Sequence, residues 1–557
     1  MLIKLFLFLL IISFLSYAFI NRKYFDDYIG YTHKLSPLTK NEIEDSSINN
    51  EIYDDDLEWE KLDNIYFKRS AVFYFVEESL LTALYLADGK HAYDIDLTAY
   101  FKNNNHYNLK IKSNDIKILN VKNLFWFEIN VTDNFFKFQS NLLQRMLISF
   151  TDKSNVTTLN PINVKIKHKI QEKKGNLICT KCYQLSQDQI PDLMWWIELN
   201  KELGYDIVYC NNSLQYDKNF ELFLNERKNF IKVVQMSYFP YFYNKSSIYL
   251  NEFEEISKYL KYSNGKMSFT HQRNSYELIQ YNECYHDNKN KYKHIAIIDI
   301  DETVIPFNRE ATDRVKYINS LNIDECHDFN CLSKRIDICN STGTEKIDQY
   351  INRIETEQIG ILFSPGYYLT ADTMKIILNR LNDFIKNYTM SELINNSIFL
   401  IVKEPNNRFN ITFKFKSYDE IIYIQKITQI FNALVNEKSL KINKTIVSSN
   451  FLDRFFYYAS EGTFKNSFKT FHNTKYIKRV GNHEAMHFPK NSSIKVPYYN
   501  GHLSHFRISY SNIFQYVSGQ NFTIYASDFG FDINYLMCHY PKILKTIQTT
   551  TVDANNN

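Results

Sequence analysis

Two aspartates one residue apart, Asp299 and Asp301, follow the apolar run 295–298. An extended backbone alternates its side chains, so these two carboxylates are expected on one side and Ile300 on the other. Two hard oxygen ligands suit Mg²⁺ or Mn²⁺, and such ions usually keep coordination positions open for the phosphate groups of a substrate. The motif therefore predicts a divalent metal site used in phosphate chemistry.

Two classes of enzyme place an Asp-x-Asp pair at a strand end. One is the nucleotide-sugar glycosyltransferase. The other is the phosphatase of the haloacid dehalogenase type, whose Asp-x-Asp-x-Thr pattern is completed here by Thr303. The segment 527–532 also imitates the acidic fourth motif of that phosphatase. Against this alternative, the phosphatase fold normally opens with its Asp-x-Asp strand, whereas an apparent α/β unit precedes Asp299.

Two further alternatives use other features of the chain. A catalytically inactive, lectin-like luminal protein is one, although the presence of both aspartates argues against it. The run 483–487 also spells the His-Glu-x-x-His pattern of zinc proteases. The preceding Gly481 and the following Pro489 break the helix that a zinc protease needs. The glycosyltransferase therefore remains the preferred hypothesis.

Composition limits the possible partners. The chain has 557 residues, 44% of them hydrophobic and 16% aromatic, which is enough to bury a large core in a globular protein of two domains. The net charge of +3 is the small difference between 65 basic and 62 acidic residues. We therefore expect no nucleic acid partner, because nucleic acid binding requires a strong basic bias.

The N-terminus predicts a compartment. The apolar run 5–20 is preceded by Lys4 and followed by Arg22 and Lys23, as in a membrane anchor or a secretory signal with a cleavage site near Ala18. Many Asn-x-Ser/Thr acceptors and an even number of cysteines, 8, agree with a luminal address. We expect a single-pass protein of the Golgi or another secretory-pathway membrane, anchored by its N-terminus and with a luminal C-terminal domain. A secreted protein is the alternative.

The cysteines suggest loops closed by disulfides. Cys326, Cys331 and Cys339 gather in a polar stretch after the Asp-x-Asp motif, as in a stapled loop. Cys179 and Cys182 have the spacing of half a zinc site, but a second matching pair is absent from the sequence. Disulfides are therefore favoured over zinc.

The second half of the chain alternates strands and helices. A strand at 176–180, a helix at 191–203 ended by Gly204 and a strand at 205–210 imply a parallel α/β sheet. A strand at 230–234, a helix at 273–283 and the metal strand at 295–300 continue it, and ligands of such sheets bind at the carboxyl ends of the strands. The predicted domains are an anchor or signal (1–23), a polar stem (24–65), a smaller β-rich domain (66–172), the α/β domain (173–545) and a disordered tail (546–557).

Several motifs, taken in order, resemble glycosyltransferase family 92 over about residues 175–510. Singly they are short, but their order is specific. The motifs that carry the resemblance are Ile178-Cys179-Thr180-Lys181, Trp196-Ile197-Glu198, Leu203-Gly204-Tyr205, Asn282-Glu283-Cys284, Asp299-Ile300-Asp301-Glu302, 475–480, His483 with His487, and His505-Phe506-Arg507.

The resemblance implies a GT-A fold, which is Rossmann-like: a mostly parallel sheet flanked by helices. It also implies a divalent metal, Mn²⁺ or Mg²⁺, a UDP-sugar donor, and transfer with inversion onto a glycan acceptor, either an N-glycan or a polysaccharide. Characterised relatives use UDP-galactose. The metal ligands implied are Asp299, Asp301 and His505, and the donor-binding residues are Cys179, Thr180, Lys181, Asp299 and Arg507. Inversion needs a carboxylate base, for which Glu302, Glu484 and Asp528 are the candidates.

Overall fold

The structure is a computed structural model of the whole chain. The chain divides into two compact units, one of residues 1–58 and 238–269 and one of residues 59–237 and 270–557. Apart from Phe269, the residues that the structure describes all lie in the second unit. They are 59–62, 65–87, 94–101, 106–111, 117–121, 124–131, 143–152, 155–158, 162–180, 190–211, 218–235, 269–300, 302–306, 311–327, 331–332, 346–354, 360–363, 365–369, 371–404, 407–436, 456–458, 469–481, 493–496, 501–505 and 521–526.

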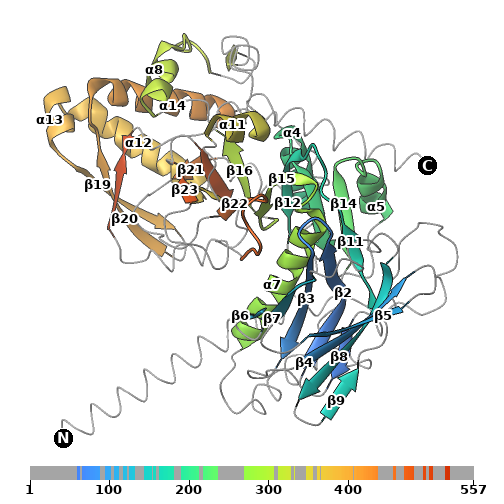
Figure 1. The fold of residues 1–557 in the computed structure, drawn as a ribbon. Helices are drawn as coiled ribbons and strands as arrows, with labels where there is room; N and C mark the ends of the chain where they lie inside the picture. Colours follow the sequence, from blue (N-terminus) through green and yellow to red (C-terminus); the bar gives the residue numbers. More distant parts are fainter. Residues whose placement is uncertain are drawn as a thin grey trace, which may run out of the picture. The chain divides into compact units, whose positions relative to one another are not determined.

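The first part of the second unit is built from strands (Figure 1), as the sequence predicts. A 6-stranded sheet has the order β1-β2-β3-β7-β6, with β11 parallel to β2, and a 5-stranded sheet has the order β10-β8-β4-β5, with β9 beside β8. The strands are β1 (Trp59–Leu62), β2 (Ile65–Phe75), β3 (Leu80–Ala87), β4 (Asp94–Phe101), β5 (His106–Ile111), β6 (Lys117–Val121), β7 (Leu124–Asn130), β8 (Leu143–Asp152), β9 (Asn155–Thr158), β10 (Ile162–Asn163) and β11 (Lys165–Lys167). β1 lies within the residues predicted as a stem, where it pairs with β2.

The sequence 71–75 explains why β2 lies at the centre of this part. Every residue of this run, Ala-Val-Phe-Tyr-Phe, is fully buried. Successive side chains of a strand point to opposite faces, so a run that is buried throughout must be covered on both faces. One face of the first sheet is therefore packed against another layer, and the aromatic contacts of Phe73 and Phe75 show that this layer includes the helix at 269–288.

The following part is a mixed α/β sheet, in agreement with the predicted α/β class. Its 7 strands have the order β14-β13-β12-β15-β22-β17-β23, in which β14, β13, β12 and β15 are parallel and β22 runs antiparallel between β15 and β17. The strands are β12 (Lys174–Cys179), β13 (Asp206–Asn211), β14 (Ile231–Gln235), β15 (Tyr292–Ile297), β17 (Gly360–Phe363), β22 (Lys469–Asn473) and β23 (Ser493–Lys495). The connecting helices include α4 (Ile190–Glu202), α5 (Lys218–Asn225), α7 (Phe269–Asn288) and α11 (Ile347–Ile354).

Helix α4 confirms the helix predicted at 191–203 and shows why it forms. Residues 193–200 are all buried, including Trp195 and Trp196, so the helix is covered on nearly every side. Gly204 follows with φ of 90°. Only glycine adopts this left-handed conformation without steric cost, and it ends the helix where β13 must begin.

The order of the strands creates one position where ligands are expected. From β12 the chain proceeds outward through β13 to β14, and then returns to add β15 on the other side of β12. The strand order therefore reverses between β12 and β15. In open α/β sheets, ligands bind at the carboxyl ends of the strands at such a reversal. Residues that follow β12 and β15 are thus placed at the predicted site.

Two smaller sheets and further helices complete the described structure. A 4-stranded sheet has the order β16-β24-β18-β21, and a 3-stranded sheet has the order β19-β20-β25. The strands are β16 (Glu302–Pro306), β18 (Pro365–Leu369), β19 (Ile398–Glu404), β20 (Asn407–Lys414), β21 (Phe456–Tyr458), β24 (Gly501–His505) and β25 (Asn521–Tyr525). The helices are α8 (Ala311–Ser320), α12 (Ala371–Asn387), α13 (Met390–Asn395) and α14 (Tyr418–Asn436).

The predicted terminal segments fall outside this description. Within the residues that the structure describes, no helix is long and apolar enough to cross a membrane. The apolar run 5–20 and the tail 546–557 are not among those residues.

Helix α7 joins the strand-built part to the α/β sheet through buried and partly buried charges. The Glu283 carboxylate lies 3.2 Å from the ammonium of Lys68 and 3.1 Å from that of Lys165. Asp287 lies 2.6 Å from Lys167. Burial would raise the pKa of Asp287, but Lys165 and Lys167 outweigh this effect and lower that pKa to about 2. Because buried charges are tolerated only when they are paired, this interface requires both partners.

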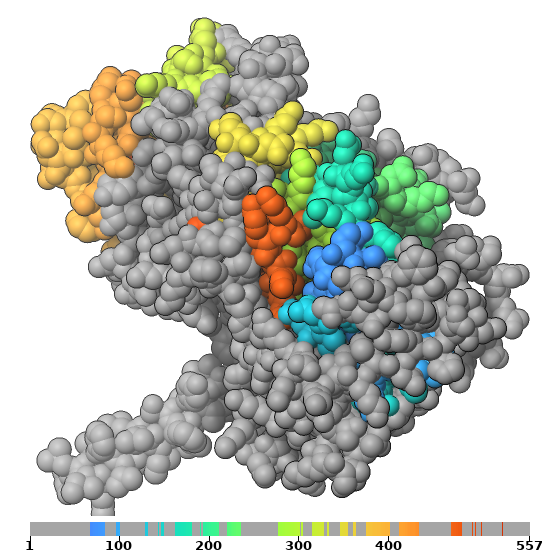
Figure 2. All heavy atoms as spheres, viewed as in Figure 1, coloured from blue at the N-terminus to red at the C-terminus, as the bar shows by residue number. Residues whose placement is uncertain are grey.

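A second contact joins the same two parts beside α7, whose Asn282 bonds the backbone of Val480. Arg479, which follows β22, forms a buried ion pair with Glu128 of β7. In Figure 2, the orange segment 469–481 lies against the blue and cyan segments of the strand-built part. The strand-built part therefore contacts the α/β part both at α7 and after β22.

The buried imidazole of His286 is expected to make the stability of the protein depend on pH. It is buried against the rings of Phe73 and Phe75, 5.3 and 5.7 Å away between ring centres. Burial lowers the pKa of His286 well below its ordinary value, and nearby cations lower it further. Below about pH 6.5 the unfolded chain binds a proton at this histidine that the folded protein does not bind. Each unit by which the pH is lowered therefore reduces the free energy of unfolding by up to about 1.4 kcal/mol. The charged groups around it are Lys167, Asp287, Lys289 and Arg479.

We therefore expect His286→Phe to reduce the loss of stability between about pH 7 and about pH 5. Urea unfolding at both pH values measures this difference in the free energy of unfolding. His472 is also buried, with its pKa lowered to about 3, so some dependence of the same sign should remain. His168→Phe, at an exposed position, is the control and should leave the dependence unchanged. An identical pH dependence in His286→Phe and the unmodified protein would contradict the prediction.

Candidate active site

The Asp-x-Asp motif forms a turn. Strand β15 ends at Ile297, and the amide N–H of Glu302 donates to the carbonyl of Asp299 at 2.9 Å. The amide of Asp299 donates in return to Oε2 of Glu302 at 3.2 Å. The expectation of an extended backbone through residue 300 is therefore wrong, because these two hydrogen bonds close a four-residue turn.

A buried lysine lies beneath the turn. The ammonium of Lys469, the first residue of β22, is 3.3 Å from Oδ2 of Asp299 and 3.2 Å from Oε2 of Glu302. The Lys469 side chain is 1% exposed, whereas that of Asp299 is 18% exposed. Burial would lower the pKa of Lys469, but the two carboxylates outweigh this and raise it above its ordinary value. The lysine is therefore a permanent cation in contact with the motif.

Helix α4 and Tyr205, which precedes β13, hold the strand that leaves the turn. The indole N–H of Trp196 donates to the Glu302 carbonyl at 2.6 Å. The hydroxyl of Thr303 donates to Oδ1 of Asn200 at 2.6 Å, and both residues are fully buried. The hydroxyl of Tyr205 donates to the carbonyl of the next residue of β16 at 3.1 Å. Three successive residues of β16 are thus fixed from one side.

The register of β16 and β24 brings a distant histidine to the motif. In this antiparallel pair, Glu302 stands opposite His505, whereas His502 stands opposite Ile305. Residues directly opposite one another in an antiparallel pair have Cα atoms about 4.5–5.5 Å apart. The backbone of His505, a predicted metal ligand, therefore lies beside the residue that follows Asp301.

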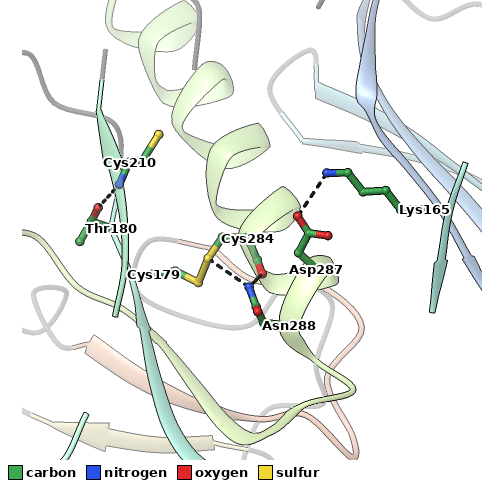
Figure 3. Close-up of a disulfide and its surroundings, with 7 residues drawn as sticks. All are labelled: Lys165, Cys179, Thr180, Cys210, Cys284, Asp287 and Asn288. Carbon is green, nitrogen blue, oxygen red and sulfur yellow. Dashed lines mark hydrogen bonds and ion pairs between the residues drawn. A yellow bond between two sulfur atoms is a disulfide. The ribbon is translucent and has the colours of Figure 1, made fainter. Parts of the chain in front are cut away.

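The end of β12 is the other side of the predicted site (Figure 3). Cys179 is buried and forms a disulfide with Cys284 of α7. Its side chain is thus unavailable to a donor, and a donor-binding role would rest on its backbone. Thr180 is 2% exposed, and its hydroxyl accepts a hydrogen bond from the Cys210 amide at 3.0 Å. Cys210 is itself disulfide-bonded.

The second disulfide agrees with the stapled loop expected after the motif. Cys326 is bonded to Cys331. Cys339, the third member of that group, lies outside the described residues. No zinc pairing is needed to account for Cys179, since its sulfur is bonded to Cys284.

The described part of the motif fits a hard divalent cation. Asp299 presents a partly exposed carboxylate, and Mg²⁺ and Mn²⁺ prefer such oxygen ligands. Among the described residues, no group of three or more His, Cys, Asp or Glu gathers as a complete metal site. The other ligands predicted, Asp301 and the side chain of His505, are outside that set, as are Lys181, Glu484, Arg507 and Asp528.

Lys469 is the residue that sequence reasoning missed. It lies 170 residues from Asp299 in the chain, and no local pattern marks it. The only available signal is a lysine at the start of a short strand whose 5 residues are all buried. A buried lysine usually has a paired carboxylate, but the sequence does not say which one.

Comparison with known proteins agrees with the resemblance seen in the motifs. No curated protein matches the chain. A solved structure, that of flavohemoglobin from Malassezia yamatoensis with bound FAD and heme, is similar over 34% of this chain and 54% of that chain, at 12% identity. The chain thus spans about half the length of that protein, and the TM-score of 0.09 is too low to carry an argument. Residues 174–357, which contain β12, β15 and the turn at Asp299, match the family model of glycosyltransferase family 92. Residues 174–357 are therefore identified as a segment of glycosyltransferase family 92.

Proposed function

We propose that the protein is a metal-dependent, inverting glycosyltransferase that moves a sugar from a UDP-sugar to a glycan. The family match carries the proposal, because it includes the turn at Asp299. The position of that turn, at the carboxyl end of β15 and beside the reversal of strand order, supports it. The parallel run β14-β13-β12-β15 also supports a GT-A fold, although β22 is inserted antiparallel.

In this proposal Asp299, Asp301 and His505 hold a Mn²⁺ or Mg²⁺ ion. When bound, such an ion would neutralise the negative charge that develops on the departing nucleotide diphosphate. Arg507 pairs with phosphate oxygens through its guanidinium, which offers several donors in a fixed plane. Thr180 and Lys181, which follow β12 in the chain, are proposed as donor-binding residues from the family resemblance.

The acceptor hydroxyl needs a carboxylate base. Glu302 is 4% exposed and paired with Lys469, so it is poorly placed to reach an acceptor. We therefore place the base at Glu484 or Asp528. Donor and acceptor are proposed from the family resemblance as UDP-galactose and an N-glycan or polysaccharide. The location is proposed as a secretory-pathway membrane, with the domain in the lumen.

The phosphatase alternative loses support at Thr303. Its hydroxyl is fully buried and donates to Asn200, so it serves the packing of β16 against α4. The strand before the motif is the fourth of its sheet along the chain rather than the first. Together with the family match, these observations favour sugar transfer over phosphate hydrolysis.

A direct assay tests the proposed function. The full chain is incubated with a panel of UDP-sugars, with and without Mn²⁺ and acceptor glycans, and release of UDP is followed. We expect release that requires both the metal and an acceptor, and that is fastest with UDP-galactose. Hydrolysis of phosphomonoesters that disappears in Asp299→Asn, without turnover of any UDP-sugar, would establish the phosphatase instead.

The register of β24 gives a prediction for its two histidines. We expect His505→Ala to weaken UDP binding in Mn²⁺ by about tenfold or more, because a proposed ligand beside the turn is lost. His502→Ala should have much less effect, because it stands three residues further along β16. Titration of UDP at several Mn²⁺ concentrations measures both. A metal-linked loss in His502→Ala alone would show that the ligand is assigned to the wrong histidine.

A further inference from the structure

The Asp299 turn is closed by a buried carboxylate, that of Glu302. Glu302 is 4% exposed, and its Oε2 is shared between the Asp299 amide and the Lys469 ammonium. A buried carboxylate is costly unless a cation compensates it. Lys469 supplies that cation and at the same time reaches Oδ2 of Asp299.

We propose that Lys469 is a positioning residue, which holds the Asp299 carboxylate and the Asp299–Glu302 turn in the arrangement that the donor requires. It does not contact the donor itself, because its side chain is only 1% exposed. This inference rests on the proposed function for its consequence, but the contact between Lys469 and the turn is independent of it.

The fold explains why a lysine can occupy this place. β22 runs antiparallel beside β15, with Ala296 opposite Phe471, so Lys469 at the beginning of β22 is level with the end of β15. Its neighbours in β22 are all buried, which keeps the side chain within the core until it meets the turn. A long aliphatic side chain with a terminal charge is suited to such a path.

Two roles for Lys469 have to be separated. In the first, it merely neutralises the buried Glu302. In the second, it also fixes Asp299. Lys469→Met alone does not distinguish them, because it removes the cation from a buried carboxylate and is expected to unfold part of the protein. The double variant Lys469→Met with Glu302→Gln removes both charges, and its glutamine can still accept from the Asp299 amide.

The chain offers a matched control. Lys68 and Glu283 form a buried pair with the same 3.2 Å separation as Lys469 and Glu302, but at the interface of β2 with α7. The variant Lys68→Met with Glu283→Gln therefore removes the same two charges without touching the turn. Lys469→Arg, which keeps a cation, serves as the conservative rescue.

Two measurements on the full chain decide the proposal. Hydrogen exchange without nucleotide reports protection of the amides of Asp299 and Glu302, and calorimetry reports UDP affinity in Mn²⁺. We expect the Lys469/Glu302 double variant to lose amide protection and to bind UDP about tenfold more weakly. The Lys68/Glu283 control should do neither, and Lys469→Arg should recover part of the affinity.

Either of two results would overturn the inference. One is unchanged amide protection in the Lys469/Glu302 double variant. The other is lost protection with UDP affinity equal to that of the unmodified protein. If the unmodified protein does not bind UDP with Mn²⁺ at all, the proposed function fails, and the exchange measurement still decides whether Lys469 holds the turn.

Discussion

Asp301→Asn is expected to abolish metal-dependent binding of UDP while leaving the fold intact. The substitution removes one carboxylate charge with almost no change of volume. The hydrogen bonds between Asp299 and Glu302, the residues on either side of the substitution, use the backbone of both and the Glu302 side chain, which Asp301→Asn leaves unchanged. Loss of a direct ligand should exceed the roughly 10- to 100-fold effect that follows loss of an outer contact.

Calorimetric titration of UDP with and without Mn²⁺ measures this effect, and urea unfolding verifies the fold. The control is Asp324→Asn, which makes the same chemical change at a residue 70% exposed and paired with Lys426. We expect no change of UDP affinity in the control. A folded Asp301→Asn variant with the metal-dependent UDP affinity of the unmodified protein would remove Asp301 from the site.

Removal of the disulfide between Cys179 and Cys284 is expected to lower the free energy of unfolding more than removal of the one between Cys326 and Cys331. The two residues are 105 apart in the chain, and the bond ties the end of β12 to α7. In the chain-entropy account, closing a loop of that length restricts the unfolded chain by roughly 5 kcal/mol. Replacement of both cysteines by alanine should therefore lower the free energy of unfolding by several kcal/mol.

The second disulfide provides the comparison. Cys326 and Cys331 are only 5 apart, and the same account gives roughly 2 kcal/mol. Guanidinium unfolding of both double-alanine variants, each without reductant, measures the difference. Equal losses in the two variants would show that strain or packing, and not loop length, decides the contribution of these bonds.

The local elements of the α/β part could be predicted because each has its own pattern. Helix α4 has apolar residues at most of its buried positions and is followed by Gly204. Strands β12, β13 and β14 each contain a short apolar run between polar segments. The turn at Asp299 could not be predicted, because its geometry depends on hydrogen bonds made by the Glu302 side chain and amide. An apolar run ending in Asp-x-Asp reads equally well as a strand or as a strand with a turn.

Pairing between strands far apart in the chain is the other reason why some contacts could not be predicted. Lys469 meets Asp299 only because β22 is inserted antiparallel beside β15, and nothing near either residue encodes that pairing. The same holds for the contact of Glu283 with Lys68. In contrast, the family motifs alone associate His505 with the Asp-x-Asp motif, and the register of β24 with β16 sets the His505 backbone opposite Glu302.

The charged interface of α7 also limits where the protein can be truncated. A truncated protein that begins at residue 173, the predicted start of the α/β domain, would lose Lys68, Lys165 and Lys167 and expose Glu283 and Asp287 on α7. It would also uncover His286, which packs against β2. The helix so exposed carries Cys284 and leads directly into β15. A shortened protein for crystallisation or assay should therefore keep residues 59–172 attached, because they belong to the same compact unit as the α/β sheet and are not an accessory module.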